Sequence, residues 1–470
     1  MTSKTTIRWV VVLTAIGSLM AAVDTLVVST ALSRIRLDLN ASVGQLEWSV
    51  NAYNLSFAVL LITAAALGDR YGRRRLYATG LGLFALSSAA GALAPNIGVL
   101  IGARAVQGVG SALIMPLGLA LLSAAFPPAK RGAAIGIFSA ITGIAVAAGP
   151  LLGGAVVQGI DWHWIFWINV PIGLATIPFV LTKMQESHGP ETGLDLRGLA
   201  LVTLGALATV WGLVRGNEAG WGSGEVVGSL AVGVLLTIAF VDWQRRAPEP
   251  MFSLELFRSR AFSGGNAAIF LTFASLFTGV FFFAQLLQTG LGFSPLATGL
   301  RLIPWTATFI TVAPVAGALT DRIGERPLMV TGLSLQAIGM AWVALIADPG
   351  MSYTQLLVPF IVAGVGVSMA IPAAQSSVVA SVADHAIGKA AGMNSMMREL
   401  GGVFGIAVAV AVFAGAGSYA SASTFVDGFQ PAIGVAAALS LVGAAAGLTL
   451  AGRRQRGVAP LIAVATESAS

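Results

Sequence analysis

The chain is built from apolar stretches, each near the length that crosses a lipid bilayer, which follow one another from end to end. A helix needs ~20 apolar residues to span the hydrocarbon core, whereas the strands of a barrel alternate apolar and polar residues. In lipid the backbone must satisfy its own hydrogen bonds, so long apolar stretches form helices. Only 10% of the residues are charged, against roughly 25% in soluble domains. The sequence therefore predicts an all-α, polytopic membrane protein.

Fourteen transmembrane helices are predicted, near residues 9–30, 46–67, 76–94, 97–122, 132–155, 164–182, 197–215, 227–244, 263–286, 296–319, 328–347, 352–378, 393–415 and 430–452. In this arrangement most of the 26 Lys and Arg residues fall on the same side of the membrane as the N-terminus. Cytoplasmic loops carry such an excess of basic residues. We therefore expect a multi-pass protein of the cytoplasmic (inner) membrane with both termini in the cytoplasm. The first stretch is expected to stay as a helix and not to be cleaved as a signal peptide.

Segments of the first half of the chain recur in the second half. VQGVGSALIMP (106–116) aligns with VAGVGVSMAIP (362–372), and LGDRYGRRR (67–75) resembles LTDRIGERP (319–327). Two homologous halves are typical of secondary transporters. The predicted organisation is a six-helix bundle over 1–182, connectors with two inserted helices over 183–262, a second six-helix bundle over 263–452, and a cytoplasmic tail over 453–470.

Several motifs carry a family resemblance that covers nearly the whole chain. They are LMAAVDTLVVSTAL (19–32) in helix 1, GDRYGRR (68–74) in the following loop, RAVQGVG (104–110) in helix 4, GIFSAITGIAVAAGPLLGG (136–154) in helix 5, and WHWIFWINVPIG (162–173). On these motifs the chain is identified as a member of the major facilitator superfamily, and it resembles the fourteen-span drug:proton antiporters. Three positions depart from the pattern: Ala65 and Ala145 stand in place of Gly, and His163 in place of Arg.

The resemblance implies a secondary active transporter that exports drug-like, lipophilic and often cationic small molecules in exchange for protons, by alternating access. The proton gradient would drive it, with no cofactor. Its partners would be protons, a small-molecule substrate and the lipid bilayer, with no nucleic acid, and we expect a monomer. An exporter or flippase for a lipid, a siderophore or an endogenous metabolite is the alternative.

Asp24 is the leading candidate for proton coupling. It lies about six residues from the outer end of the first predicted helix, or roughly 9 Å deep. A charge in the bilayer centre costs ~2.5–3.5 kcal/mol on insertion scales, so such a group usually faces a cavity or a partner. An exporter driven by protons needs a carboxyl that gains and loses a proton in each cycle. The competing interpretation is an acid that pairs structurally with Arg34 or lies in the outer membrane interface.

Arg104 and Glu399 are the other candidates for proton coupling. The resemblance implies that Arg104, with Gln107 one turn away, modulates the proton affinity of a carboxylate. A structural post that holds helix 4 is the alternative. Glu399 is a possible second proton site. Because Arg398 precedes it directly, the two side chains should point about 100° apart, which argues against a mutual pair. A pair at the membrane rim is the alternative.

The predicted substrate cavity combines polar groups with adaptable aromatic and sulfur-containing side chains. Its candidates are Asp24, Gln107, Met115, Arg398, Phe282 and Trp305, with Phe281, Phe283 and Met369 as further possibilities. Each of the apolar residues also suits a surface that faces lipid, so the pocket is the least constrained part of the prediction.

Two further features point to conformational change. The antiporter motif holds Gly149, Pro150, Gly153 and Gly154, in which Pro150 removes a helical hydrogen bond and the glycines leave a bare face for close packing. The two related loops carry opposite charges, Asp69, Arg70 and Arg73 in the first and Asp321 and Arg322 in the second. Such sets can latch helix ends in one conformation and release them in another.

Other protein classes are disfavoured by what the sequence lacks. It has no Cys and only 3 His, which are scattered, so no metal site is predicted. It also lacks the GxxxxGK[ST] loop of P-loop ATPases. A membrane enzyme or receptor is therefore the less favoured hypothesis, and no enzyme activity is expected.

Overall fold

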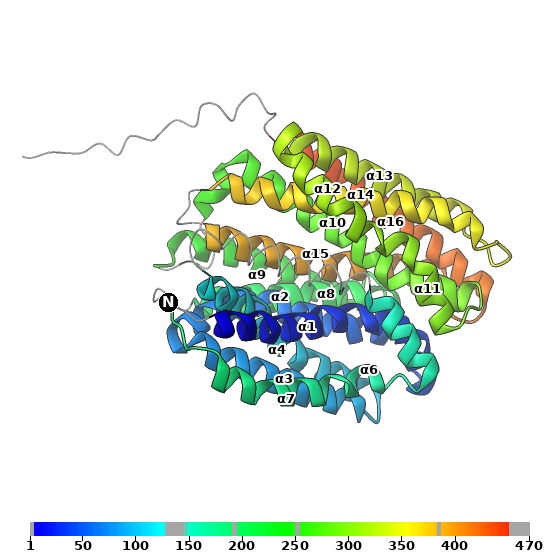
Figure 1. The fold of residues 1–470 in the computed structure, drawn as a ribbon. Helices are drawn as coiled ribbons and strands as arrows, with labels where there is room; N and C mark the ends of the chain where they lie inside the picture. The colour runs from blue at the N-terminus through cyan, green and yellow to red at the C-terminus, as the bar shows by residue number, and fades with distance from the viewer. Residues whose placement is uncertain are drawn as a thin grey trace, which may run out of the picture.

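The computed structural model describes residues 4–126, 145, 148–189, 195–248, 250, 254–382 and 387–450, and its regular structure in these ranges is entirely helical. The helices run along one common direction and form an elongated array (Figure 1). In chain order they are α1 (Lys4–Asp38), α2 (Val43–Tyr71), α3 (Arg73–Ala92), α4 (Ile97–Ala125), a helical stretch over 148–159, α6 (Trp164–Trp167), α7 (Asn169–Lys183), α8 (Leu196–Ala219), α9 (Gly224–Arg246), the 3₁₀ turn η2 (Leu254–Arg258), α10 (Arg260–Gln285), the π-helical turn η3 (Leu286–Gly290), α11 (Pro295–Thr306), α12 (Thr308–Ile323), α13 (Glu325–Ile346), α14 (Thr354–Ala380), α15 (Ile387–Ala416) and α16 (Ala422–Gly447). We call the end of the array that holds the N-terminus the near end, and the end where α1 finishes and α2 begins the far end.

Local signals in the sequence set several helix boundaries. Ser42 forms a capping box with Gln45, in which the Gln45 N–H donates to Ser42 Oγ over 3.3 Å and the Ser42 N–H donates to Gln45 Oε1 over 2.9 Å. Such a box satisfies N–H groups that the first helical turn leaves unpaired. Gly72 separates α2 from α3 with φ 107°, a conformation that glycine adopts without steric cost. The chain therefore reverses sharply between these two helices.

The prediction of an all-helical membrane protein is confirmed. Twelve helices among the described residues are long and apolar enough to cross a membrane. α3 is not one of the twelve, and the predicted span over 132–155 lies mostly outside the described residues. The count of fourteen spans therefore stays a prediction.

Two predicted spans differ from the helices observed. The first helix continues past residue 30 to Asp38, because Leu32 and Ile35 extend its buried face and are both 0% exposed. The predicted span over 296–319 is divided at Ala307 into α11 and α12. Pro304 has no N–H to donate within α11, which weakens the helix just before the division.

The packing of the helices reflects the repeat in the sequence. Gly108 of α4 lies against α2 and Gly110 against α3, so closely that a Cβ atom at either position would overlap the neighbouring backbone. Gly364 of α14 lies in the same way against the junction of α11 and α12, and Gly366 against α13. Small residues allow such close approach between membrane helices. The two aligned glycine pairs thus make corresponding contacts in the two parts of the chain.

The helix pair α8 and α9 lies beside the seam between α2 and α15. The ring of the α8 residue Trp211 lies near that of Trp48 of α2, with centroids 6.3 Å apart and the planes tilted by 49°, and the Asn217 side chain of α8 donates to the Ala411 carbonyl of α15. α8 therefore covers the line along which α2 meets α15 (Figure 1).

Candidate functional site

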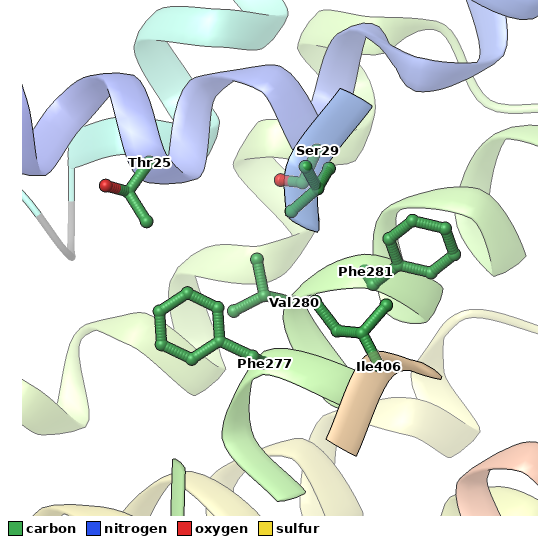
Figure 2. A pocket seen from close by; sticks show the side chains of 7 residues that line it. Thr25, Ser29, Phe277, Val280, Phe281 and Ile406 are labelled. Atoms are coloured by element: carbon green, nitrogen blue, oxygen red, sulfur yellow. The ribbon is translucent and has the colours of Figure 1, made fainter. Parts of the chain in front are cut away.

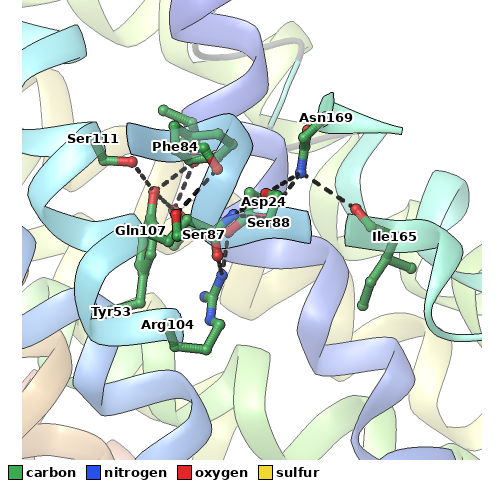
Figure 3. Close-up of polar contacts among 12 residues, drawn as sticks. Asp24, Tyr53, Phe84, Ser87, Ser88, Arg104, Gln107, Ser111, Ile165 and Asn169 are labelled. Carbon is green, nitrogen blue, oxygen red and sulfur yellow. Dashed lines mark hydrogen bonds and ion pairs between the residues drawn. The ribbon is translucent and has the colours of Figure 1, made fainter. Parts of the chain in front are cut away.

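Asp24 lies near the middle of α1 and is 1% exposed. The prediction that it sits close to the outer end of its helix is wrong, because α1 continues to Asp38 and places Asp24 about 21 Å from that end at ~1.5 Å per residue. The Asp24 carboxyl group points toward α4 and α7 (Figure 3).

Arg104 of α4 forms an ion pair with Asp24. The guanidinium also donates to Gln107 Oε1 over 2.7 Å and to the Ser49 carbonyl of α2 over 3.1 Å, and it lies 4.2 Å from the ring centroid of Tyr53. Arg104 is itself 1% exposed. The structure thus brings the predicted acid and the predicted counter-charge into direct contact, with Arg104 and not Arg34 as the cation.

Amide and hydroxyl groups complete the cluster around the carboxylate. Gln107 Nε2 donates to Asp24 Oδ1 over 2.9 Å and to Ser88 Oγ of α3 over 2.7 Å. Asn169, the first residue of α7, donates to Asp24 Oδ1 over 3.3 Å. Side chains of α4 and α7 therefore donate to the Asp24 carboxyl of α1, and Ser88 of α3 accepts from Gln107 and Asn169 beside it (Figure 3). Asp24 is held by one cation and two amides.

The ion pair between Asp24 and Arg104 depends on whether the Asp24 carboxyl carries a proton. A buried charge is tolerated when it is paired and hydrogen-bonded. A proton on the Asp24 carboxyl would remove its attraction for the guanidinium and leave the Arg104 charge to find other partners. Protonation of this site would therefore change the contacts that join α1 to α4.

Glu399 and Arg398 of α15 form an ion pair, in which Arg398 Nε donates to Glu399 Oε1 over 2.8 Å. The prediction that these adjacent residues do not pair is wrong. The long Arg398 side chain turns back along the helix and reaches the carboxylate, although the two Cβ atoms point in different directions. Glu399 is 4% exposed and its second oxygen, Oε2, has no hydrogen-bond partner within the described chain.

A small cavity of about 10 Å³ lies where α1, α2, α10 and α15 meet (Figure 2). It is lined by Thr25, Ser29, Val50, Phe277, Val280, Phe281 and Ile406. A volume of this size holds about one water molecule. The described helices are thus packed closely around the centre of the array.

Most of the apolar residues predicted for the substrate cavity lie elsewhere. Phe282 packs against Phe413 and Phe429, and Trp305 packs against Phe283 with ring centroids 5.1 Å apart. Met115 is buried among residues of α1 to α4. These residues are packed in the hydrophobic core between neighbouring helices. Aromatic and sulfur-containing side chains fill a core as readily as they line a pocket.

The glycines of the antiporter motif pack on both sides of the helical stretch over 148–159. Gly149 and Gly153 lie against α1, where a Cβ on Gly153 would stand 2.3 Å from Thr30 Oγ1. Gly154 faces α11, where a Cβ would stand 2.3 Å from the Pro295 carbonyl oxygen, and Pro150 lies against Gly299 of α11. The earlier part of the motif, before residue 145, lies outside the described residues. The glycines of the motif therefore let this helical stretch pack closely against α1 on one side and α11 on the other.

The charged loop between α2 and α3 makes its contacts within the first part of the chain. Arg73 Nε pairs with Asp69 Oδ1 over 2.7 Å, and the Arg73 N–H donates to the Ser187 carbonyl over 2.9 Å. Glu186 accepts from the backbone N–H of Arg74 over 2.8 Å at the first turn of α3. Arg70 lies over the Tyr71 ring and Arg322 is exposed, while the side chain of Asp321 lies outside the described residues. The predicted latch between the two loops thus stays a prediction.

Sequence reasoning missed three residues of the Asp24 cluster. Ser88 and Tyr53 carry no sequence signal apart from being polar groups in apolar stretches. Asn169 lies inside WHWIFWINVPIG, a motif that was used only for the resemblance, so an amide in that motif was a usable signal. Reasoning from the sequence also passed over Glu47, Asn51 and Asn54, a row of polar residues at helical spacing in the second predicted span.

Comparisons with known proteins identify the family. The family model described as Major Facilitator Superfamily matches residues 14–406 and 266–465. The tetracenomycin C resistance and export protein of Streptomyces glaucescens is 36% identical over 398 residues, which cover 84% of this chain and 73% of that protein. The puromycin resistance protein pur8 of Streptomyces alboniger is 33% identical over 413 residues, which cover 87% and 82%.

Solved structures of transporters share the fold. A peptide transporter POT in complex with sulfate superposes with a TM-score of 0.70 at 15% identity, covering 94% of each chain. The nucleoside transporter NupG superposes with a TM-score of 0.67 at 13% identity, covering 93% of this chain and 99% of that chain. The chain therefore belongs to the Major Facilitator Superfamily and is a multi-pass membrane transporter, not an enzyme.

Proposed function

We propose that this transporter exports drug-like small molecules, often cationic, across the cytoplasmic membrane in exchange for protons. The observation that carries the proposal is the buried cluster in which Asp24 is held by Arg104, Gln107 and Asn169. A carboxyl whose protonation breaks an interhelical ion pair couples proton binding to helix movement. The choice of substrate class is supported by the tetracenomycin C resistance and export named for one relative and by the puromycin resistance named for another.

The proposed cycle is alternating access between two six-helix bundles, with the pair α8 and α9 inserted between them and fourteen spans in all. The helical stretch over 148–159 and α11 meet at the far end, where the Leu296 N–H donates to Gln158 Oε1 over 3.0 Å. This contact supports a conformation in which the far end is closed. We further propose that both termini face the cytoplasm, that the protein acts as a monomer, and that the loops holding Asp69, Arg73 and Arg322 rearrange when the near end opens and closes.

Asp24→Asn is expected to abolish substrate-evoked proton movement, because an amide cannot take up the transported proton. Purified protein in liposomes with an imposed pH gradient and an internal pH-sensitive dye would receive doxorubicin or ethidium. The wild type should answer with proton flux, and the variant should lose at least nine-tenths of the initial rate.

The matched control is Asp242→Asn, which removes a carboxylate from a half-exposed pair with Arg246 at the end of α9. This variant should keep the wild-type proton flux, since exposed ion pairs contribute little to the stability of the fold. Full proton flux in Asp24→Asn would refute the proposed role of Asp24 and direct attention to Glu399. A wild type that moves no protons with any compound would contradict antiport itself.

A further inference from the structure

One buried carboxyl in the interior of the array, that of Glu47, forms no ion pair with a cation among the described residues. Glu47 of α2 is 0% exposed. Its partner among the described residues is Asn51, whose Nδ2 donates to Glu47 Oε1 over 2.9 Å, and Glu47 Oε2 has no hydrogen-bond partner there. Asp24 and Glu399 are each paired with an arginine. Glu47 is therefore the carboxyl of these three that can accept a cationic group.

Glu47 begins a row of polar side chains along one face of α2. Asn51 and Asn54 follow at the i+4 and i+7 positions, so the three side chains lie above one another. Asn54 is 1% exposed, and neither its Oδ1 nor its Nδ2 has a partner within the described chain; Asn51 Oδ1 also lacks one. Buried polar groups are normally hydrogen-bonded, and each unmade bond costs ~1–3 kcal/mol. The row thus offers polar atoms to a partner that the described residues do not supply.

The row faces the contact between α2 and α15. Asn51 Nδ2 lies 3.5 Å from the Val403 carbonyl, and Ile62, further along α2, lies beside Gly392. These two contacts show that the helices run antiparallel and bring Asn54 to the depth of Glu399. Glu399 Oε2, at the same depth, also lacks a hydrogen-bond partner within the described chain.

A pocket of about 390 Å³ opens at the far end of the same seam. Val43 and Gly44, four and three residues before Glu47, form part of its wall on α2, and Val410 and Ala414 form part of its wall on α15. Residues at these spacings lie one helical turn above Glu47. The pocket wall on α2 therefore lies one helical turn from Glu47, which is buried and does not itself line the pocket. The pocket volume is that of a site for a drug-sized ligand.

The chemistry of the walls indicates which ligand fits. The pocket contains Asn217 of α8, Tyr419 and Arg36, whose guanidinium lies 4.7 Å from the Tyr419 ring centroid. The aromatic ring suits a flat apolar body, and Arg36 suits carbonyl or other acceptor groups on it. The residues that line the pocket include no acid, so the acid available to a cationic group is the buried Glu47, one turn below the wall on α2.

We propose that the seam between α2, α8 and α15 is a ligand site for aromatic compounds that carry a protonated amine, with the amine bound by Glu47 and the polar row beneath the pocket. This inference rests on the proposed export function and assigns cation recognition to Glu47, whereas Asp24 is already neutralised by Arg104. A protonated amine has three donors, which match the unpaired oxygens of Glu47 and Asn51.

The test compares binding of doxorubicin, which is fluorescent and has one protonated amine, with its N-acetyl derivative, which lacks that charge. Fluorescence anisotropy with purified protein in lipid nanodiscs gives both dissociation constants without any need for transport. The wild type should bind doxorubicin at least tenfold more tightly than the derivative. Glu47→Gln should remove this preference and leave the affinity for the derivative within about twofold.

Glu225→Gln is the matched control, because Glu225 pairs with Arg215 near the far ends of α8 and α9 and lies outside the pocket. It should keep the tenfold preference. Ala414→Trp provides a second variant in case Glu47→Gln fails to fold, since Ala414 is an exposed pocket residue. The indole should fill the pocket and weaken the binding of both compounds at least tenfold.

Three outcomes would overturn the inference. They are a wild type with equal affinity for both compounds, a preference that survives Glu47→Gln, and full binding to Ala414→Trp. A wild type that binds neither compound would overturn the proposed drug export as well. A wild type that moves no protons but keeps its preference for doxorubicin would instead count against antiport alone. The hypothesis of antiport and the hypothesis of cation binding at Glu47 can therefore fail separately.

Discussion

Arg104→Gln is expected to destabilise the transporter by ~3–5 kcal/mol, because it leaves the Asp24 carboxylate buried without its cation. Both side chains are 1% exposed or less at their charged ends, so water cannot replace the missing partner. The free energy of unfolding, measured by titrating the purified protein with denaturing detergent, should fall by this amount. Export of doxorubicin from cells should fall to the background level.

A double variant separates the effect of the unpaired charge on stability from the effect of lost packing. Asp24→Asn with Arg104→Gln removes both charges at once, so it should recover most of the lost stability while transport stays absent. Arg215→Gln, in a pair that is about one-third exposed, should cost below about 1 kcal/mol. If Arg104→Gln proved as stable as the wild type, the ion pair would contribute nothing to the fold and the proposed link between protonation and helix contacts would lose its basis.

Gly154→Val is expected to reduce export at least tenfold by preventing closure of the far end. A Cβ at this position would stand 2.3 Å from the Pro295 carbonyl oxygen and 3.1 Å from Leu296 Cα. Both are backbone atoms, so no side-chain rotation relieves the overlap, and α11 must move away from the helical stretch over 148–159. Separation there would stop a cycle that requires the two helices to meet.

Because the chain has no Cys, closure can be measured with an engineered pair. Gln158→Cys with Leu296→Cys places two thiols where the side chain and backbone of these residues touch. Disulfide formation between the two introduced cysteines should be rapid in the protein that keeps Gly154 and slow when Gly154→Val is added. Gly159→Val is the control, since no atom lies within 4 Å of a Cβ there. Rapid disulfide formation together with normal export in Gly154→Val would show that this contact is not needed for the cycle.

The class of the protein could be predicted from the sequence because the bilayer restricts the choice of structure so strongly. Apolar stretches of spanning length have one common solution in lipid, which is the helix. The repeat of VQGVG at 106–110 and VAGVG at 362–366 predicted two related halves, and Gly108 and Gly364 make close contacts at corresponding positions. Small residues at fixed spacing identify a packing surface before its partner is known.

Helix ends were less predictable, because continuing a helix depends on tertiary burial. The last turns of α1 contain Arg34, Arg36 and Asp38, which in isolation suggest a loop. Leu32 and Ile35 on the opposite face are fully buried against other helices, and this burial keeps the segment helical. The depth assigned to Asp24 was wrong for the same reason.

The sequence by itself determined the helical membrane architecture, the repeat and the short set of charged residues in the spans, because periodicity and hydropathy are properties of single segments. Only the tertiary structure decided that Asp24 pairs with Arg104, that Asn169 joins them, and that Glu47 is buried without a paired cation one helical turn from a pocket. These facts depend on how far each helix is rotated about its axis and shifted along its neighbour. Rotation and shift are set by side chains on several helices together, and no one segment contains that information.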